Sequence, residues 1–83
     1  MNIDNCNKYA MHNKKAIHES EKCGCYFCEN IFLSSQVYSY VDDDQTALCP
    51  TCGIDALLPG VTDKEFLHKA HQHWFTPRHR NTD

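Results

Sequence analysis

Cys23-Gly24-Cys25-Tyr26-Phe27-Cys28 and Cys49-Pro50-Thr51-Cys52-Gly53 are the two stretches that decide how this chain folds. Each holds a pair of cysteines separated by two residues, and 20 residues lie between one pair and the other. A two-residue spacer lets both sulfurs approach one metal ion at about 2.3 Å while backbone amides of the turn point at the thiolates. The spacing therefore predicts one four-sulfur metal site, with Cys25, Cys28, Cys49 and Cys52 as its ligands.

Two further cysteines complicate this assignment. Cys23 lies two residues before Cys25 and is the alternative ligand, because it could replace Cys25 in a wider turn. The two-residue spacing favours Cys25, which leaves Cys23 as a reduced thiol packed beside the site; ligand exchange or redox sensing by Cys23 stays open. Cys6 lies in a stretch with neither helical nor strand periodicity, and we expect it to be an exposed thiol.

The identity of the metal is a separate question. Zinc is the usual occupant of a reduced four-sulfur site, but iron binds in the same tetrahedron in rubredoxin, whose cysteine pattern is similar. The likeness is confined to the two turns, and the first turn has Glu29 where rubredoxin has glycine. We therefore expect one structural zinc ion, with iron as the less favoured alternative.

Length and composition also favour a metal. The chain has 83 residues and a formal net charge of −3. A hydrophobic core of this size contributes only about 3–5 kcal/mol, so such a domain needs a further staple. The sequence shows no apolar leader segment and no apolar run near the roughly 18–20 residues that cross a bilayer. We expect a cytoplasmic protein without a membrane partner, whose thiols stay reduced.

The chain divides into a flexible arm at 1–12, a single zinc-binding domain at 13–76 and a flexible tail at 77–83. Asn13 is placed to cap a short helix over 14–21, with Ala16 and Ile17 facing the core. Short strands are expected at 31–33 and 46–48. Residues 37–41 fit a strand or a helix equally well, and 42–44 form a turn.

The clearest helix signal is at 63–75. Thr62 and Glu65 can form a capping box, and four apolar residues further on share one face of the helix: Phe66, Leu67, Ala70 and Trp74. We expect this face to pack over Phe32, Leu48 and Ile54. The predicted fold class is α+β: a small zinc-stabilised domain of zinc-ribbon or treble-clef type with a C-terminal amphipathic helix.

Motifs along the chain also carry a resemblance. They are Cys-Gly-Cys-x-x-Cys at 23–28, Thr-Ala-Leu-Cys-Pro-x-Cys-Gly-Ile-Asp at 46–55, Glu-Phe-Leu at 65–67 and Trp-Phe at 74–75, with His-Asn-Lys-Lys-Ala-Ile at 12–17 before them. Together they resemble a family of small bacterial and phage-borne zinc-binding proteins, usually labelled only as cytoplasmic proteins. The family has no established activity, so the resemblance implies the domain and not a function. The chain departs from it between Leu58 and Thr62, where a glycine-containing loop is shorter.

The charge distribution disfavours nucleic acid as a partner. No Lys or Arg occurs from Glu29 to Thr62, whereas five acidic residues do. Four thiolates around a divalent ion add further negative charge, and phosphate contacts need the opposite sign. Basic residues lie only in the flanks, among them Arg78 and Arg80. A nucleic-acid-binding zinc ribbon is therefore the second interpretation, and a rubredoxin-like redox protein the third.

The leading interpretation is a non-enzymatic zinc-binding module that binds another protein, as a regulatory or host-directed factor. Aromatic residues exceed what so small a core needs, and such residues anchor protein interfaces. The candidate partner-binding residues are Tyr26, Tyr38, Tyr40 and Phe75. Four-cysteine sites offer no open position for a catalytic water, and no histidine lies between the cysteine pairs. His68, His71, His73 and His79 lack the spacing of helical zinc ligands, so we expect no second metal site.

Overall fold

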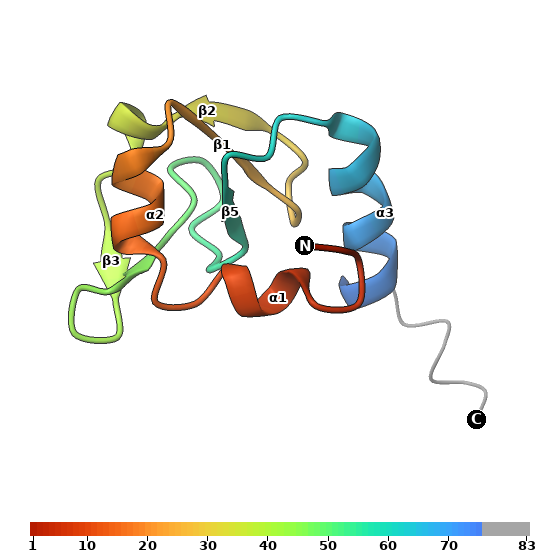
Figure 1. Ribbon diagram of the computed structural model, residues 1–83, viewed down its shortest axis with the longest axis horizontal. Coiled ribbons are helices and arrows are strands. Elements are labelled where there is room, and N and C mark those ends of the chain that lie inside the picture. The colour runs from red at the N-terminus through yellow and green to blue at the C-terminus, as the bar shows by residue number, and fades with distance from the viewer. Residues whose placement is uncertain (76–83) are drawn as a thin grey trace.

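The computed structural model describes residues 1–75 and forms an α+β fold (Figure 1). The predicted tail at 77–83, with residue 76, lies outside the described residues. In chain order the elements are α1 (Cys6–Tyr9), α2 (Lys14–Glu19), β1 (Lys22–Cys25), β2 (Ile31–Leu33), the 3-10 helix η1 (Ser34–Gln36), β3 (Tyr40–Val41), β4 (Thr46–Ala47), β5 (Leu57–Pro59) and α3 (Lys64–Phe75).

Two small antiparallel sheets position the cysteine pairs. One has the strand order β2-β1-β5, with Cys23 opposite Phe32 on one side and Pro59 on the other; the second sheet pairs β3 with β4. The turn between β1 and β2 carries Cys28, and the loop between β4 and β5 carries the second cysteine pair. The central strand β1 thus links the first cysteine pair to the core.

The N-terminal segment corrects one expectation. We expected Cys6 to be exposed in a loose arm, but its side chain is fully buried, as is that of Ala10 one helical turn later. Reciprocal hydrogen bonds between Asn2 and Asn5 precede α1, and the Trp74 indole N–H donates to the Ile3 carbonyl at 2.8 Å. The prediction for Cys6 is wrong because this contact with Trp74, far along the chain, holds the N-terminal segment against α3.

Asn13 precedes α2, but its side chain does not cap the helix. Its amide nitrogen donates to the carbonyls of Tyr9 at 3.0 Å and Leu57 at 2.8 Å, and its amide oxygen accepts from the backbone N–H of Ala47 at 3.0 Å. The Asn13 side chain therefore links β4 to β5. The helix ends at Glu19, two residues earlier than expected, and Ile17 is its fully buried residue.

The cap of α3 also differs from the prediction by one residue. The Asp63 carboxylate, rather than the Thr62 hydroxyl, accepts the backbone N–H groups of Glu65 at 3.0 Å and Phe66 at 3.4 Å. Asp63 is as good a capping residue as threonine, and sequence alone does not choose between neighbours.

The helix α3 packs on β1. Leu67 and Ala70 are fully buried, whereas Trp74 is 36 % exposed. Gly24 makes this approach possible, because a Cβ at that position would lie 2.6 Å from the Val61 carbonyl oxygen and 2.9 Å from a Leu67 methyl carbon. No helix of the described chain is both long and apolar enough to cross a membrane.

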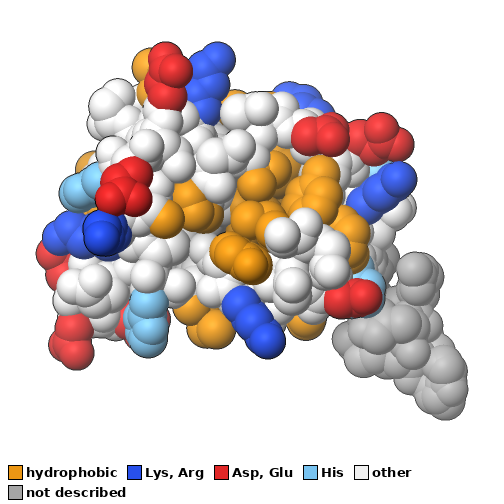
Figure 2. All heavy atoms as spheres, viewed as in Figure 1, with side chains coloured by type: hydrophobic (Ala, Val, Ile, Leu, Met, Phe, Trp, Pro, Cys, Tyr) orange, Lys and Arg blue, Asp and Glu red, His pale blue; other side chains and the backbone are white. Residues whose placement is uncertain are grey.

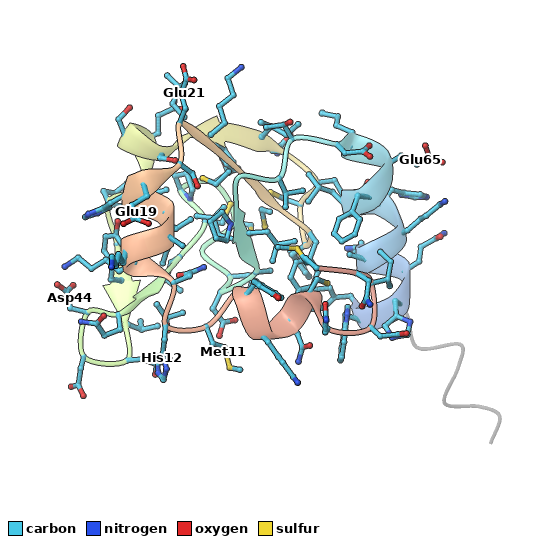
Figure 3. All side chains as sticks on the ribbon, in the orientation of Figure 1. Met11, His12, Glu19, Glu21, Asp44 and Glu65 are labelled. Atoms are coloured by element: carbon cyan, nitrogen blue, oxygen red, sulfur yellow. The ribbon has the colours of Figure 1, made fainter. Side chains whose placement is uncertain are left out.

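The ambiguous window at 37–41 divides between two states. Val37 follows η1 and is buried, whereas Tyr40 and Val41 form β3. The turn that follows has an uncommon backbone: Asp42, Asp43 and Asp44 all have positive φ, at 57°, 58° and 69°. Asp44, at the outer side of this turn in Figure 3, pairs with Lys14 at 2.7 Å.

On the face of the molecule that Figure 2 shows, a group of hydrophobic side chains lies at the surface. Figure 2 shows these side chains gathered in front of the N-terminus and β5, next to α3. A shallow groove of about 470 Å³ lies here, lined by Met1, Pro59, Gly60, Val61, Thr62, Asp63 and Phe66.

Candidate metal centre

The fold brings together the four cysteines whose spacing predicted a metal site. The Sγ atoms of Cys25, Cys28, Cys49 and Cys52 all lie within 4.8 Å of one another. Cys25 Sγ is 3.7 Å from Cys52 Sγ, and Cys28 Sγ is 3.6 Å from Cys49 Sγ, so each of these two approaches joins one turn to the other. Within residues 1–75 no other group of three or more metal-binding side chains gathers in this way.

The size of this cluster fits a metal ion better than a disulfide. Four sulfurs at about 2.3 Å from a central ion form a tetrahedron whose edges are about 3.8 Å long. The separations of 3.6 and 3.7 Å match that edge. A disulfide would need about 2.05 Å, and all six cysteines are free thiols. The four residues can therefore hold one tetrahedral metal ion.

The two turns are built on one hydrogen-bonding plan. In the first, Cys25 Sγ accepts the backbone N–H groups of Phe27 at 3.4 Å and Cys28 at 3.5 Å. In the second, Cys49 Sγ accepts those of Thr51 at 3.4 Å and Cys52 at 3.5 Å. Such bonds stabilise thiolates and hold them in position for a metal.

The backbone that closes each turn repeats in the same way. Glu29 donates to the Cys25 carbonyl at 2.8 Å, and Gly53 donates to the Cys49 carbonyl at 3.0 Å. Both residues adopt a left-handed conformation, with φ of 64° at Glu29 and 76° at Gly53. The absence of glycine at Glu29 therefore does not change the turn, although a residue with a Cβ pays a steric cost there.

Burial and hydrogen bonding act differently on the thiols of Cys25, Cys49 and Cys52. Burial raises the pKa of Cys25 well above its ordinary value, and burial also raises the pKa of Cys52. Burial opposes ionisation of Cys49 as well, but the amides of Cys52 and Thr51, together with the thiols of Cys28 and Cys52, outweigh it and lower the pKa of Cys49. A dication at the centre would favour the thiolate at every position.

Cys23 is not among the gathered sulfurs. It shares one face of β1 with Cys25, because side chains two positions apart in a strand point the same way, and it is fully buried. Burial raises its pKa, against the smaller opposing effect of the Ser34 hydroxyl. The position of Cys23 is that of a packed thiol beside the cluster, with Cys25 at the ligand position.

The helix α3 rests on the first turn through contacts at three successive levels. His68 Nδ1 lies 3.1 Å from a Glu29 carboxylate oxygen, and His71 Nδ1 lies 3.2 Å from the Tyr26 carbonyl oxygen. At the third level Phe75 packs on Phe27, with ring centroids 4.9 Å apart and nearly perpendicular planes. His68 and His71 therefore hold α3 against the first turn through two separate contacts.

His73 and His79 are the other two histidines that were considered as metal ligands. His73 Nε2 is 3.5 Å from Asp4, on the side of α3 that faces the N-terminal segment. His79 lies outside the described residues. None of the histidines of residues 1–75 joins a cluster that could hold a metal ion.

The predicted partner-binding residues have very different exposures. The expectation that Tyr26 is exposed is wrong, because this residue is only 5 % exposed and packs against Phe75. Burial raises the pKa of its phenol to about 12. Tyr38 is 76 % exposed and Phe75 is 38 % exposed, whereas Tyr40 is half-buried against His18. Tyr26 contributes to the core because it follows Cys25 directly out of the central strand.

Two residues that matter here were not predicted from the sequence. Phe27 is 37 % exposed and lies between the metal centre and α3. Asn30 donates from its side-chain amide to Cys28 Sγ at 3.5 Å. An asparagine two residues after a metal-binding cysteine is the signal that could have identified the second.

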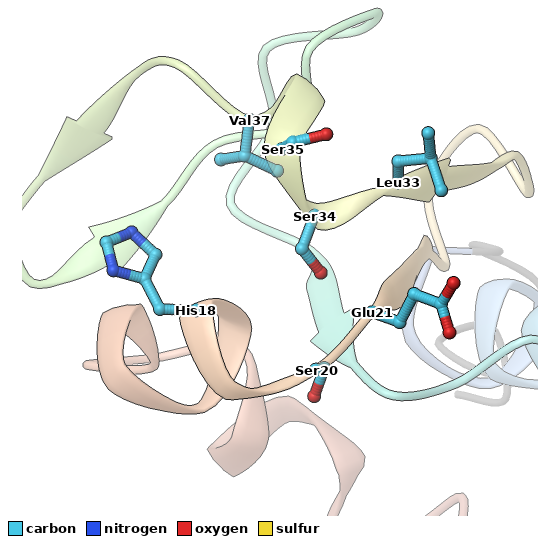
Figure 4. Close-up of a pocket in the computed structure, with 7 residues that line it drawn as sticks. All are labelled: His18, Ser20, Glu21, Leu33, Ser34, Ser35 and Val37. Carbon is cyan, nitrogen blue, oxygen red and sulfur yellow. The ribbon is translucent and has the colours of Figure 1, made fainter.

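A larger hollow of about 650 Å³ lies away from the metal centre, at the junction of α2, β1 and η1 (Figure 4). Its lining residues are His18, Ser20, Glu21, Leu33, Ser34, Ser35 and Val37. Figure 4 shows His18 at one end and Glu21 at the other, so these two side chains do not converge on a common point. The cysteine cluster is therefore the better candidate for function.

Comparison with known proteins adds no relative: no family model, no curated protein and no solved structure matches this chain.

Proposed function

We propose that this protein is a non-enzymatic zinc-binding module of zinc-ribbon type whose metal ion fixes a surface for another protein. The single observation that carries the proposal is the four-cysteine cluster of tetrahedral dimensions. Four sulfur ligands saturate a zinc ion and leave no position for a substrate or a catalytic water, so the ion acts on structure.

Two features support the ribbon type over the treble clef. In a treble clef the second ligand pair lies at the start of a helix, whereas here Cys49 and Cys52 lie in a loop that leads into β5. The two turns also share one hydrogen-bonding plan. Zinc is favoured over iron because it is the usual metal of reduced four-sulfur sites. Reduced thiols also support a cytoplasmic location.

The choice of a protein partner rests on exposed aromatic side chains. Tyr38, Phe27 and Phe75 are exposed by 76 %, 37 % and 38 %, and aromatic residues of this kind anchor protein interfaces. The loop that carries Cys49 and Cys52 contains no Lys or Arg that could bind phosphate. The basic residues on which nucleic-acid binding would depend, Arg78 and Arg80, lie outside the described residues.

Metal analysis and affinity capture test the two parts of this proposal. Elemental analysis of colourless purified protein should find one zinc ion per chain; a red protein containing iron would overturn the choice of metal. Capture from nuclease-treated lysate should give a stoichiometric protein partner, and Tyr38→Ala should weaken its binding. Met11→Ala is the matched control, because Met11 is an exposed apolar residue outside the proposed surface, with 51 % exposure. Salt-sensitive binding to nucleic acid instead would reverse the ranking of partners.

A further inference from the structure

The four cysteines of the metal centre are not equally accessible. Cys25 and Cys49, the first cysteine of each turn, are 0 % and 3 % exposed. Cys28 and Cys52, the second cysteine of each turn, are half-buried. Their neighbours Asn30 and Gly53 are exposed, and a Cβ added at Gly53 would meet nothing within 4 Å. One edge of the sulfur tetrahedron, from Cys28 to Cys52, therefore faces solvent.

Hydrogen bonding also distinguishes Cys25 and Cys49 from Cys28 and Cys52. Cys25 and Cys49 each accept two backbone N–H groups from their own turn. Cys28 accepts the Asn30 side-chain amide at 3.5 Å, and the backbone amide of Ile54 favours the thiolate of Cys52. A donated N–H withdraws electron density from sulfur and makes a metal-bound thiolate a poorer nucleophile. Exposure and hydrogen bonding thus both point to Cys28 and Cys52 as the reactive sulfurs.

We propose that the Cys28–Cys52 edge is a covalent modification site for soft electrophiles, at which attack begins and from which the metal is lost. A thiolate at this edge forms a carbon–sulfur bond with an alkyl halide such as iodoacetamide, the carbon–iodine bond breaks, and iodide leaves with the electron pair. The product is a neutral thioether. Because the thiolate is the ligating form of cysteine, the remaining three sulfurs hold the ion less well.

Asn30 moderates this reactivity at one of the two sulfurs. Its amide bonds to Cys28 and has no counterpart on a side chain beside Cys52, where Ile54 follows the cysteine by two residues. The side chain of Asn30 is exposed, so Asn30→Ala leaves the core unchanged. The backbone carbonyl of Asn30, which accepts from Cys25 at 2.9 Å, is retained in that variant.

Competitive alkylation of the whole zinc-loaded protein tests the proposal without a partner. The protein is treated with substoichiometric iodoacetamide, zinc release is followed with a chromophoric chelator, and the labelled cysteines are mapped by chymotryptic digestion and tandem mass spectrometry. Cleavage after Tyr26 and Phe27 separates Cys25 from Cys28. We expect Cys28 and Cys52 to label roughly tenfold faster than Cys25 and Cys49, with zinc release following the first label.

The buried thiols Cys6 and Cys23 serve as internal references within the same digest. Equal labelling of all four ligands, or faster labelling of Cys25 and Cys49, would overturn the proposal, as would labelling at Cys28 and Cys52 that releases no zinc. In Asn30→Ala the ratio of label on Cys28 to label on Cys52 should rise roughly twofold to fivefold. An unchanged ratio would overturn the role given to Asn30.

Discussion

Asn13 shows how much one buried polar side chain can contribute to a chain of this size. It is 4 % exposed, and its amide group satisfies two carbonyls and one backbone N–H from three different segments. The bonds to the Leu57 carbonyl and the Ala47 N–H are buried, so removal of the amide would leave these two groups without this partner. A buried polar group without a partner costs about 1–3 kcal/mol.

We therefore expect Asn13→Ala to reduce the free energy of unfolding by about 2–4 kcal/mol. Chemical denaturation of the zinc-loaded protein measures this change. Lys15→Ala, two residues further on in α2, is the matched control, because the Lys15 side chain is 88 % exposed and pairs only loosely with Glu19 at 4.0 Å. If both variants lost the same few tenths of a kcal/mol, Asn13 would not have the bridging role described here.

Asp43 is a second residue whose effect follows from the backbone. It is exposed and has φ of 58°, between two neighbours that are also left-handed. A residue with a Cβ costs about 1 kcal/mol in this conformation, whereas glycine adopts it freely.

We expect Asp43→Gly to raise the free energy of unfolding by about 0.5–1 kcal/mol, since the relief of strain exceeds the added flexibility of the unfolded chain. The midpoint of urea denaturation should move upward accordingly. Ser35→Gly, an exposed change at a residue without positive φ, should move the midpoint downward. A downward shift in both variants would show that the Asp43 conformation is not strained.

Gly53 and Gly24, which lie close in sequence to the metal-binding cysteines, are required for different reasons. At Gly53 the requirement is conformational, because φ is 76° and no atom lies within 4 Å of an added Cβ. At Gly24 the requirement is steric, because an added Cβ would meet the Val61 backbone and Leu67 of α3. The first is a property of one turn, whereas the second concerns the packing of α3 on β1.

Both Gly24→Ala and Gly53→Ala should destabilise the protein, but in different ways. Gly53→Ala should cost about 1–2 kcal/mol by backbone strain and weaken zinc binding. Gly24→Ala should cost about 3 kcal/mol, because a backbone carbonyl cannot move aside as a side chain can, and should shift Trp74 fluorescence as α3 is displaced. Equal fluorescence changes in the two variants would contradict the separation of turn and helix packing.

At the scale of the whole molecule, the metal and α3 are connected through the first turn. Three residues of that turn, Tyr26, Phe27 and Glu29, contact α3. If the turn is held by the ion, removal of the ion should release both the turn and the helix that rests on it.

A strong chelator should therefore abolish most of the tertiary structure and lower the helical circular dichroism signal, and one equivalent of Zn²⁺ should restore both. Cys25→Ser should reproduce the metal-free state, whereas Cys23→Ser should still bind one zinc ion. Retention of the full structure after verified removal of the metal would refute the structural role of the ion.

The parts of this fold that could be predicted are those with local signals. The spacing of the cysteines predicted which four sulfurs gather, because a two-residue turn constrains its own ligands. The strands at 31–33 and 46–47 were visible for a similar reason, since they adjoin these turns. β1 and β5 were not predicted, because β1 has a glycine between two cysteines and β5 ends in proline, and both residue types are unfavourable in strands.

The errors concern burial, which depends on distant residues. Cys6 is covered because the N-terminal segment is held to α3 through Ile3 and Trp74. Tyr26 is covered because Phe75, far along the chain, packs on it. Neither contact has a signature in the residues next to the one that is buried.

The bridging amide of Asn13 also limits how this molecule can meet other chains. It occupies the Leu57 carbonyl on the outer edge of β5 and the Ala47 N–H on β4, and Pro59 has no N–H to offer. On the opposite edge of the sheet, the Gln36 side chain accepts the Leu33 N–H at 2.8 Å. One backbone group on each outer edge of the three-stranded sheet is thus already engaged. An incoming strand would therefore form fewer backbone hydrogen bonds at these edges, which favours recognition through side chains and disfavours templated growth into fibrils.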